Sequence, residues 1–133
     1  MIVLDTSAAL ACVAGVDASP ALRSRVGSAG TMHVPHLIDV EFLSGLRGLV
    51  LGGKLTDDRA RDAITDFANL RLVRYPLPGI AQRVWAKRHT LTAYDAVFVS
   101  LAEALRCPLV TCDRRLARSP HDAEVELFPA TSS

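Results

Sequence analysis

Four acidic residues adjoin the ends of predicted strands or the starts of predicted helices, where their side chains could share one reaction. They are Asp5, Glu41, Asp95 and Asp113. If these carboxylates meet, their charges repel and raise some of their pKa values, a conflict that divalent cations remove. Oxygen ligands alone favour Mg²⁺ or Mn²⁺ over zinc. Such a site, with one metal or two, can deprotonate a bound water, orient it at a phosphorus and stabilise the leaving oxygen.

Asp5 ends the short apolar run Ile2-Val3-Leu4, which is typical of a strand covered on both faces. In open α/β sheets, ligands bind beyond the carboxyl ends of the strands, where Asp5 would lie. We expect Thr6 or Ser7 to cap a helix that starts near Ala8. The alternative is that Asp5 is itself the helix N-cap.

Asp113 ends a second apolar run, residues 108–113, which predicts the fourth strand. Thr111, two residues earlier, could hold a water or a carboxylate in place. Three arginines follow between positions 114 and 118.

Glu41 lies in the longest predicted helix, from Pro35 to Gly52. Its helical stripe leaves space for a ligand or another backbone, because it includes Leu37, Ser44, Gly45 and Gly48. Asp39 projects from nearly the opposite side and is a poor candidate for the same site. The alternative for Glu41 is a solvated acid favoured by the helix dipole.

Asp95 belongs to a Thr92-x-x-Asp95 sequence that resembles a capping box. It also lies at the edge of a predicted buried stripe, which continues through Phe98, Val99 and Ala102, whereas Ser100 and Glu103 are expected to face solvent. An ionised carboxylate at such an edge is costly unless it is paired, hydrogen-bonded or bound to a metal. Capping and metal binding can coexist.

The alternation of strands and helices predicts an α/β fold, with a doubly wound and mainly parallel sheet of four to five short strands flanked by helices. All four acids then face one edge of the sheet. Further strands are expected at 31–34, 72–75 and 125–128, and further helices at 20–27, 56–69 and 79–89. We expect a single domain over residues 1–128 and a flexible C-terminal tail over 129–133.

The helix predicted over 79–89 has one apolar and one basic face. Its inward side chains are expected to be Ile80, Val84 and Trp85, and its outward ones Arg83, Lys87 and Arg88. A solvated face is the simplest interpretation of these charges, and contact with RNA phosphates is the alternative.

The net charge of +1 does not indicate a protein that binds nucleic acid through bulk charge. Half of the residues are hydrophobic and the mean hydropathy is +0.24, which suggests an apolar patch for a partner. The three cysteines match neither a CxxC motif nor a zinc site, so free thiols in a reducing cytoplasm are expected. No apolar segment reaches the ~18 residues of a membrane span.

Together these motifs resemble those of the PIN-domain ribonucleases, and the compact length resembles their VapC-type toxin branch. The matching segments are Asp5-Thr6-Ser7, Glu41 after Pro35, Thr92-x-Tyr94-Asp95-Ala96 and Thr111-Cys112-Asp113. The resemblance implies a PIN-like fold and a metal-dependent endoribonuclease that hydrolyses RNA with a metal-activated water. By motif matching, the four acids are implied to be ligands of Mg²⁺ or Mn²⁺, with supporting roles for Thr6 and Thr111. Some members carry a further acid shortly after the Asp113 position, where this chain has Leu116 and Ala117.

The resemblance also implies inhibition by a cognate VapB-type antitoxin. The apolar positions of the helix predicted over 35–52 surround nearly its whole circumference, so one side is free for a partner. We expect a homodimer and an antitoxin segment in an apolar groove.

Three other α/β classes fit poorly. A haloacid-dehalogenase-type phosphatase needs a second Asp where Ser7 stands, a receiver domain needs paired early acids, and a dinucleotide-binding domain needs glycines after the first strand. The open alternative is a PIN-like module that binds RNA or protein without cleavage.

Overall fold

The computed structural model describes residues 1–130 and contains one sheet of five parallel strands. The strands are β1 (Ile2–Leu4), β2 (Met32–Pro35), β3 (Leu72–Tyr75), β4 (Leu109–Thr111) and β5 (Val125–Leu127). Their order is β3-β2-β1-β4-β5, which puts the first strand at the centre. The predicted parallel sheet is therefore confirmed.

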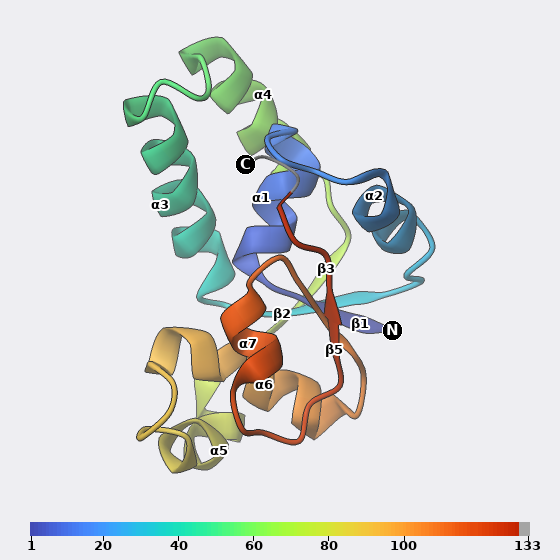
Figure 1. Ribbon diagram of the computed structural model, residues 1–133, viewed down its shortest axis with the longest axis vertical. Helices are drawn as coiled ribbons and strands as arrows, with labels where there is room; N and C mark the ends of the chain where they lie inside the picture. Colours follow the sequence, from blue (N-terminus) through green and yellow to red (C-terminus); the bar gives the residue numbers. More distant parts are fainter. Residues whose placement is uncertain (131–133) are drawn as a thin grey trace.

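Helices cover both faces of this sheet. They are α1 (Thr6–Ala14), α2 (Pro20–Gly27), α3 (Ile38–Leu51), α4 (Asp57–Ala68), α5 (Ala81–Ala86), α6 (Ala93–Leu105) and α7 (Arg114–Arg118), with a 3₁₀ helix at Leu77–Ile80. Figure 1 shows α1 to α4 on one side of the sheet and α5 and α6 on the other. Consistent with these layers, α1 packs on α3 and α4, whereas α6 packs on β1, β2 and β4.

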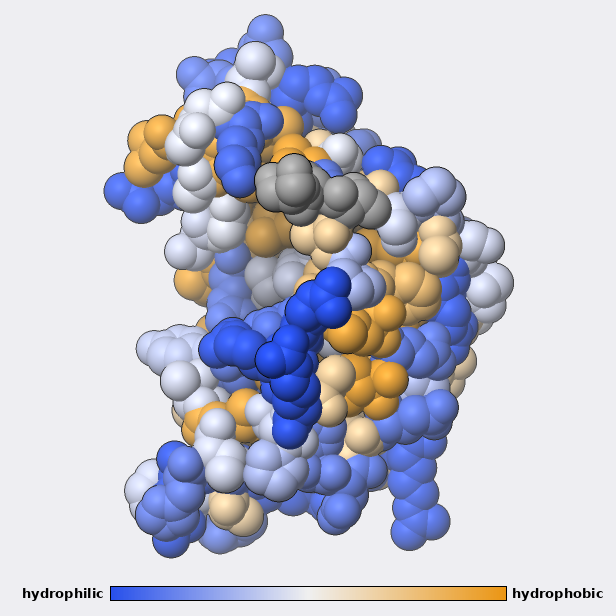
Figure 2. Space-filling model, in the orientation of Figure 1, coloured by the Kyte–Doolittle hydropathy of each residue, from blue (hydrophilic) through white to orange (hydrophobic). Residues whose placement is uncertain are grey.

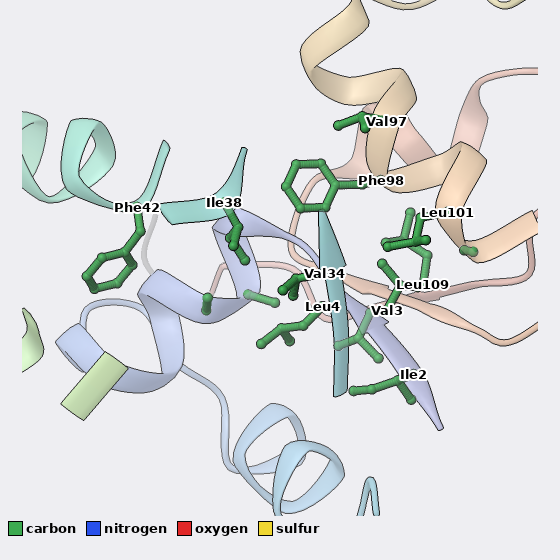
Figure 3. Close-up of a cluster of buried hydrophobic side chains, with 14 of the residues drawn as sticks. Ile2, Val3, Leu4, Val34, Ile38, Phe42, Val97, Phe98, Leu101 and Leu109 are labelled. Carbon is green, nitrogen blue, oxygen red and sulfur yellow. The ribbon is translucent and has the colours of Figure 1, made fainter. Parts of the chain in front are cut away.

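The central strands β1 and β4 are apolar because both of their faces are covered. Ile2, Val3 and Leu4 are fully buried. Figure 3 shows the helical side chains that enclose the sheet: Ile38 and Phe42 of α3 on one side, and Val97, Phe98 and Leu101 of α6 on the other. Strands buried on both faces read as continuous apolar runs, which is why the sequence located β1 and β4 well.

The helix predicted to begin at Pro35 begins three residues later. Pro35 remains in β2, paired with Tyr75 of β3, and the amide of His36 donates to the Tyr75 carbonyl at 3.1 Å. This pairing holds the backbone extended, so α3 begins only at Ile38. The prediction was wrong because pairing of Pro35 with Tyr75 in the sheet overrides the preference of proline for a helix start.

A nearly buried ion pair joins α5 to α6, where the sequence placed solvated charges. Lys87 Nζ lies 2.6 Å from Glu103 Oε1 and donates to Ser100 Oγ at 3.1 Å. Lys87, Glu103 and Ser100 were all expected to face solvent, and that prediction was wrong because α5 covers a second side of α6. Trp85, predicted to point inward, is 65% exposed, with the Arg88 guanidinium 4.9 Å from its ring centroid.

The described residues include only the start of the tail predicted over 129–133. Pro129 and Ala130 belong to no helix or strand, and residues 131–133 lie outside the described residues. The domain boundary at residue 128 stays a prediction. Across residues 1–130, no helix combines the length and the apolar character needed to cross a bilayer.

Lys87→Ala is expected to lower the free energy of unfolding by about 3 kcal/mol, because it leaves the Glu103 carboxylate buried without its cation. Arg83→Ala is the matched control, since Arg83 lies 3.9 Å from the same carboxylate but is half exposed. It should cost less than about 1 kcal/mol. Urea unfolding measures both values, and equal losses would contradict a dominant Lys87–Glu103 pair.

Candidate active site

The four predicted acids line one cavity of about 300 Å³ at the carboxyl edge of the sheet. Asp5 follows β1, Asp113 follows β4, and Glu41 and Asp95 stand in the first turns of α3 and α6. The other lining residues are Thr6, Ser7, Ser44, Gly45, Phe98 and Leu116. The topology thus brings together all four acids, while their role as metal ligands stays a prediction.

Asp5 is 5% exposed and is the N-cap of α1, which begins directly after it. The expected cap by the following hydroxyl residues was therefore wrong, and the alternative was right. The carboxylate accepts from the Ala8 amide at 2.9 Å, from Ser7 Oγ at 2.7 Å and from Thr111 Oγ1 at 2.5 Å. Burial raises the pKa of Asp5 to about 6; these hydrogen bonds oppose the rise, and the charge of Asp113 adds to it.

Ser7 and Thr111 connect the ends of β1 and β4. Besides contacting Asp5, Ser7 Oγ accepts from the Cys112 amide at 3.0 Å, and Thr111 Oγ1 accepts from the Asp113 amide at 3.0 Å. The sequence suggested that Thr111 could hold a carboxylate, and it does. Ser7 is predicted only as a possible helix cap and not as a site residue, although its place two residues after Asp5 is a signal for that role.

Glu41 accepts a 2.7 Å hydrogen bond from Thr6 Oγ1. Burial raises the pKa of Glu41, the Thr6 bond lowers it, and the charge of Asp95 raises it further. Asp39 points elsewhere, as predicted: its two oxygens each lie 2.8 Å from the Arg74 guanidinium. Of the two acids at the start of α3, Glu41 is therefore the one in the cavity.

Asp95 and Asp113 share a cation that the sequence did not reveal. Arg115 Nη2 lies 2.6 Å from Asp113 Oδ2 and 3.5 Å from Asp95 Oδ2. Burial tends to raise the pKa of Asp113, but the hydrogen bonds and charge of Arg115 outweigh it and hold that pKa below its ordinary value. Asp95 also donates its amide to Thr92 Oγ1, which confirms the predicted threonine cap.

The four carboxylates are chemically suited to bind a divalent cation, although they are not gathered around one point. Coulombic repulsion couples Asp5 to Asp113 and Glu41 to Asp95, the situation that a cation relieves. Among residues 1–130, no three His, Cys, Asp or Glu side chains lie close enough to form a ready-made site. Mg²⁺ usually keeps several waters and is held by one or two carboxylates, so it could bind at this edge without all four acids meeting at one point.

A larger and more apolar cavity of about 740 Å³ adjoins the acids. It lies between α1, α3 and α7, and it shares Ser7, Gly45 and Asp113 with the acidic cavity. A side chain on Gly45 would collide with Leu10, so the glycine permits the close approach of α1 to α3. Figure 2 shows the hollow here, bordered by strongly hydrophilic side chains over α7.

A family model for the PIN domain matches residues 2–121. The chain belongs to the PIN-domain family. It is 44% identical over 117 residues to the VapC ribonuclease Mb0985 of Mycobacterium bovis, a match covering 88% of this chain and 89% of the relative. It is 39% identical over 128 residues to ribonuclease VapC12 of Mycobacterium tuberculosis, covering 96% and 98% of the two chains. The predicted resemblance to the VapC branch is confirmed.

Two solved structures share the fold. PAE2754 from Pyrobaculum aerophilum gives a TM-score of 0.67 at 21% identity, over 93% of this chain and 82% of that one. VapBC2 from Rickettsia felis, bound to a DNA fragment from its promoter, gives 0.65 at 15% identity, over 96% and 99%. These two solved proteins thus share the arrangement of helices around the parallel sheet.

Asp5→Asn is expected to leave the metal-free fold as stable or more stable at neutral pH. Folding raises the pKa of Asp5 from 3.8 to about 6. The Asp5 carboxyl therefore stabilises the fold fully below pH 3.8, and this stabilisation is lost as the pH rises through about 6. Asn avoids this loss. Urea unfolding in EDTA should show the variant gaining at most about 3 kcal/mol on wild type between acidic and neutral pH. A difference in unfolding free energy between variant and wild type that does not change with pH would contradict the raised pKa of Asp5.

Proposed function

We propose that this chain is an endoribonuclease toxin of the VapC type, which hydrolyses RNA phosphodiester bonds with Mg²⁺ or Mn²⁺. The observation that carries the proposal is the set of four carboxylates around one cavity at the edge of the sheet. Similarity to two proteins named as ribonucleases supports RNA as the substrate class. Three free cysteines fit the cytoplasm as the place of action.

Asp5, Glu41, Asp95 and Asp113 would hold the metal, with one ion or two. When bound, the metal supplies Lewis acidity, which lowers the pKa of a water and offsets charge at the phosphorus. The chain itself orients the carboxylates, because the hydroxyls of Thr6 and Thr111 donate to Glu41 and Asp5. These donors favour the ionised forms, and so they oppose the rise in pKa that burial imposes.

The competing function is a PIN-like module that binds RNA or protein without cleavage. The observation that favours it is the Arg115 bridge, which already neutralises part of the negative charge on Asp95 and Asp113. A metal titration paired with a cleavage assay separates the two functions.

Cleavage of single-stranded or loop RNA is expected to require Mg²⁺ or Mn²⁺ and to stop in excess EDTA. Asp5→Asn and Asp95→Asn should each lower turnover by at least about a hundredfold, because each removes a charged ligand. Asp39→Asn is the control, since its carboxylate pairs with Arg74 outside the cavity. Gel-based cleavage assays on RNA measure these rates, and undiminished cleavage in EDTA would sink the mechanism.

We further propose a VapB-type antitoxin and a second copy of the chain as partners. The 740 Å³ cavity could take an amphipathic antitoxin segment, which could direct a basic residue towards the neighbouring acids. On α3, Val40, Leu43 and Leu51 are more than half exposed, which supports a further apolar interface.

Expression of the chain alone should arrest growth, and co-expression of the neighbouring small reading frame should relieve the arrest. Light scattering should give the mass of a dimer for the isolated protein. Leu49→Arg places a charge in the 740 Å³ cavity and should weaken antitoxin binding at least about tenfold, because burying an unpaired charge is costly. A monomer that neither arrests growth nor binds the product of the neighbouring reading frame would count against both proposed partners.

A further inference from the structure

Arg115 makes a bridge between two acids that come from different parts of the fold. Its guanidinium contacts both oxygens of Asp113, with Nε 3.2 Å from Oδ1 and Nη2 2.6 Å from Oδ2, and Nη2 also lies 3.5 Å from Asp95 Oδ2. The backbone adds to this grip, because the Arg115 amide donates to Asp113 Oδ1 at 2.9 Å. One cation thus spans the end of β4 and the start of α6.

The bridge can break at little cost. The Arg115 side chain is 71% exposed, whereas those of Asp95 and Asp113 are 28% and 24% exposed. Ion pairs in contact with water contribute at most about 1 kcal/mol. By contrast, the Asp5 carboxylate is buried under three donors and cannot exchange its partners so easily. The site therefore has a fixed inner acid and two outer acids on a removable cation.

We propose that Arg115 competes with the divalent cation for Asp95 and Asp113, and that it binds an RNA phosphate once the metal has displaced it. This inference rests on the proposed function of the same site. A metal ion and a guanidinium on the same carboxylates repel each other, so they exclude one another in part. A planar guanidinium released at the rim of the cavity suits a phosphate, which it can bind through two parallel hydrogen bonds.

The first test is the affinity of the free protein for Mn²⁺, measured by calorimetry without RNA. Arg115→Ala should bind Mn²⁺ about two- to fivefold more tightly than wild type, a factor that corresponds to the free energy of an exposed ion pair. Arg118→Ala is the matched control: it removes an exposed arginine of the same short helix, which contacts none of the four acids among residues 1–130. Thermal unfolding checks that both variants fold.

The second test is the division of the kinetic effect at saturating Mn²⁺. Arg115→Ala should raise KM for RNA several-fold, with a smaller change in kcat. The KM of Arg115→Lys should lie between those of wild type and Arg115→Ala, because lysine keeps the charge without the planar guanidinium. Unchanged or weaker Mn²⁺ binding by Arg115→Ala would overturn the competition, and an unchanged KM would overturn the phosphate contact.

These outcomes differ from failure of the proposed function. If wild type neither binds Mn²⁺ nor cleaves RNA, the proposed function itself fails. If wild type does both and Arg115→Ala behaves as wild type does, only the role of Arg115 is refuted.

Discussion

Burial of the Asp5 carboxylate at the end of the central strand is the constraint on which the site depends. A buried carboxylate is costly unless donors surround it, and here an amide and two hydroxyls do so. Those donors come from the first turn of α1 and from β4, so satisfying one side chain fixes how β1, α1 and β4 meet. Thr111 also positions Asp113, because the Thr111 hydroxyl accepts a hydrogen bond from the Asp113 amide.

The remaining acids are held by progressively looser means. Glu41 is half-buried and has one hydroxyl donor, Thr6, whereas Asp95 and Asp113 face an exposed arginine. This gradient supports the proposed function, in which Asp5 would be a defined inner ligand and the outer acids would admit a metal and a large anionic substrate. In that proposal, preorganisation near Asp5 would limit the reorganisation that binding demands, and the more exposed outer acids would be the ones to move.

Sequence reasoning located the central apolar strands, the Thr92 cap and the four acids that line the cavity, because each depends on local pattern. It failed where one helix covers another. Lys87 and Glu103 look like solvated charges in their own helices, and only the packing of α5 on α6 makes them a nearly buried pair. The same limit applies to Trp85, whose helical position looked internal but is exposed. Periodicity finds an apolar stripe, but it does not show how many neighbours a helix has.

The sequence by itself determined the fold class, since apolar runs that end in acids and alternate with helices specify a parallel sheet with its acids at one edge. It also determined the family, through the ordered motifs around Asp5, Glu41, Asp95 and Asp113. Only the tertiary structure decided what neutralises those acids. Arg115 lies two residues from Asp113 but twenty from Asp95, and its bridge exists because the end of β4 lies beside the start of α6. Local patterns encode which residues are buried, whereas charge pairing depends on distances that only the assembled fold sets.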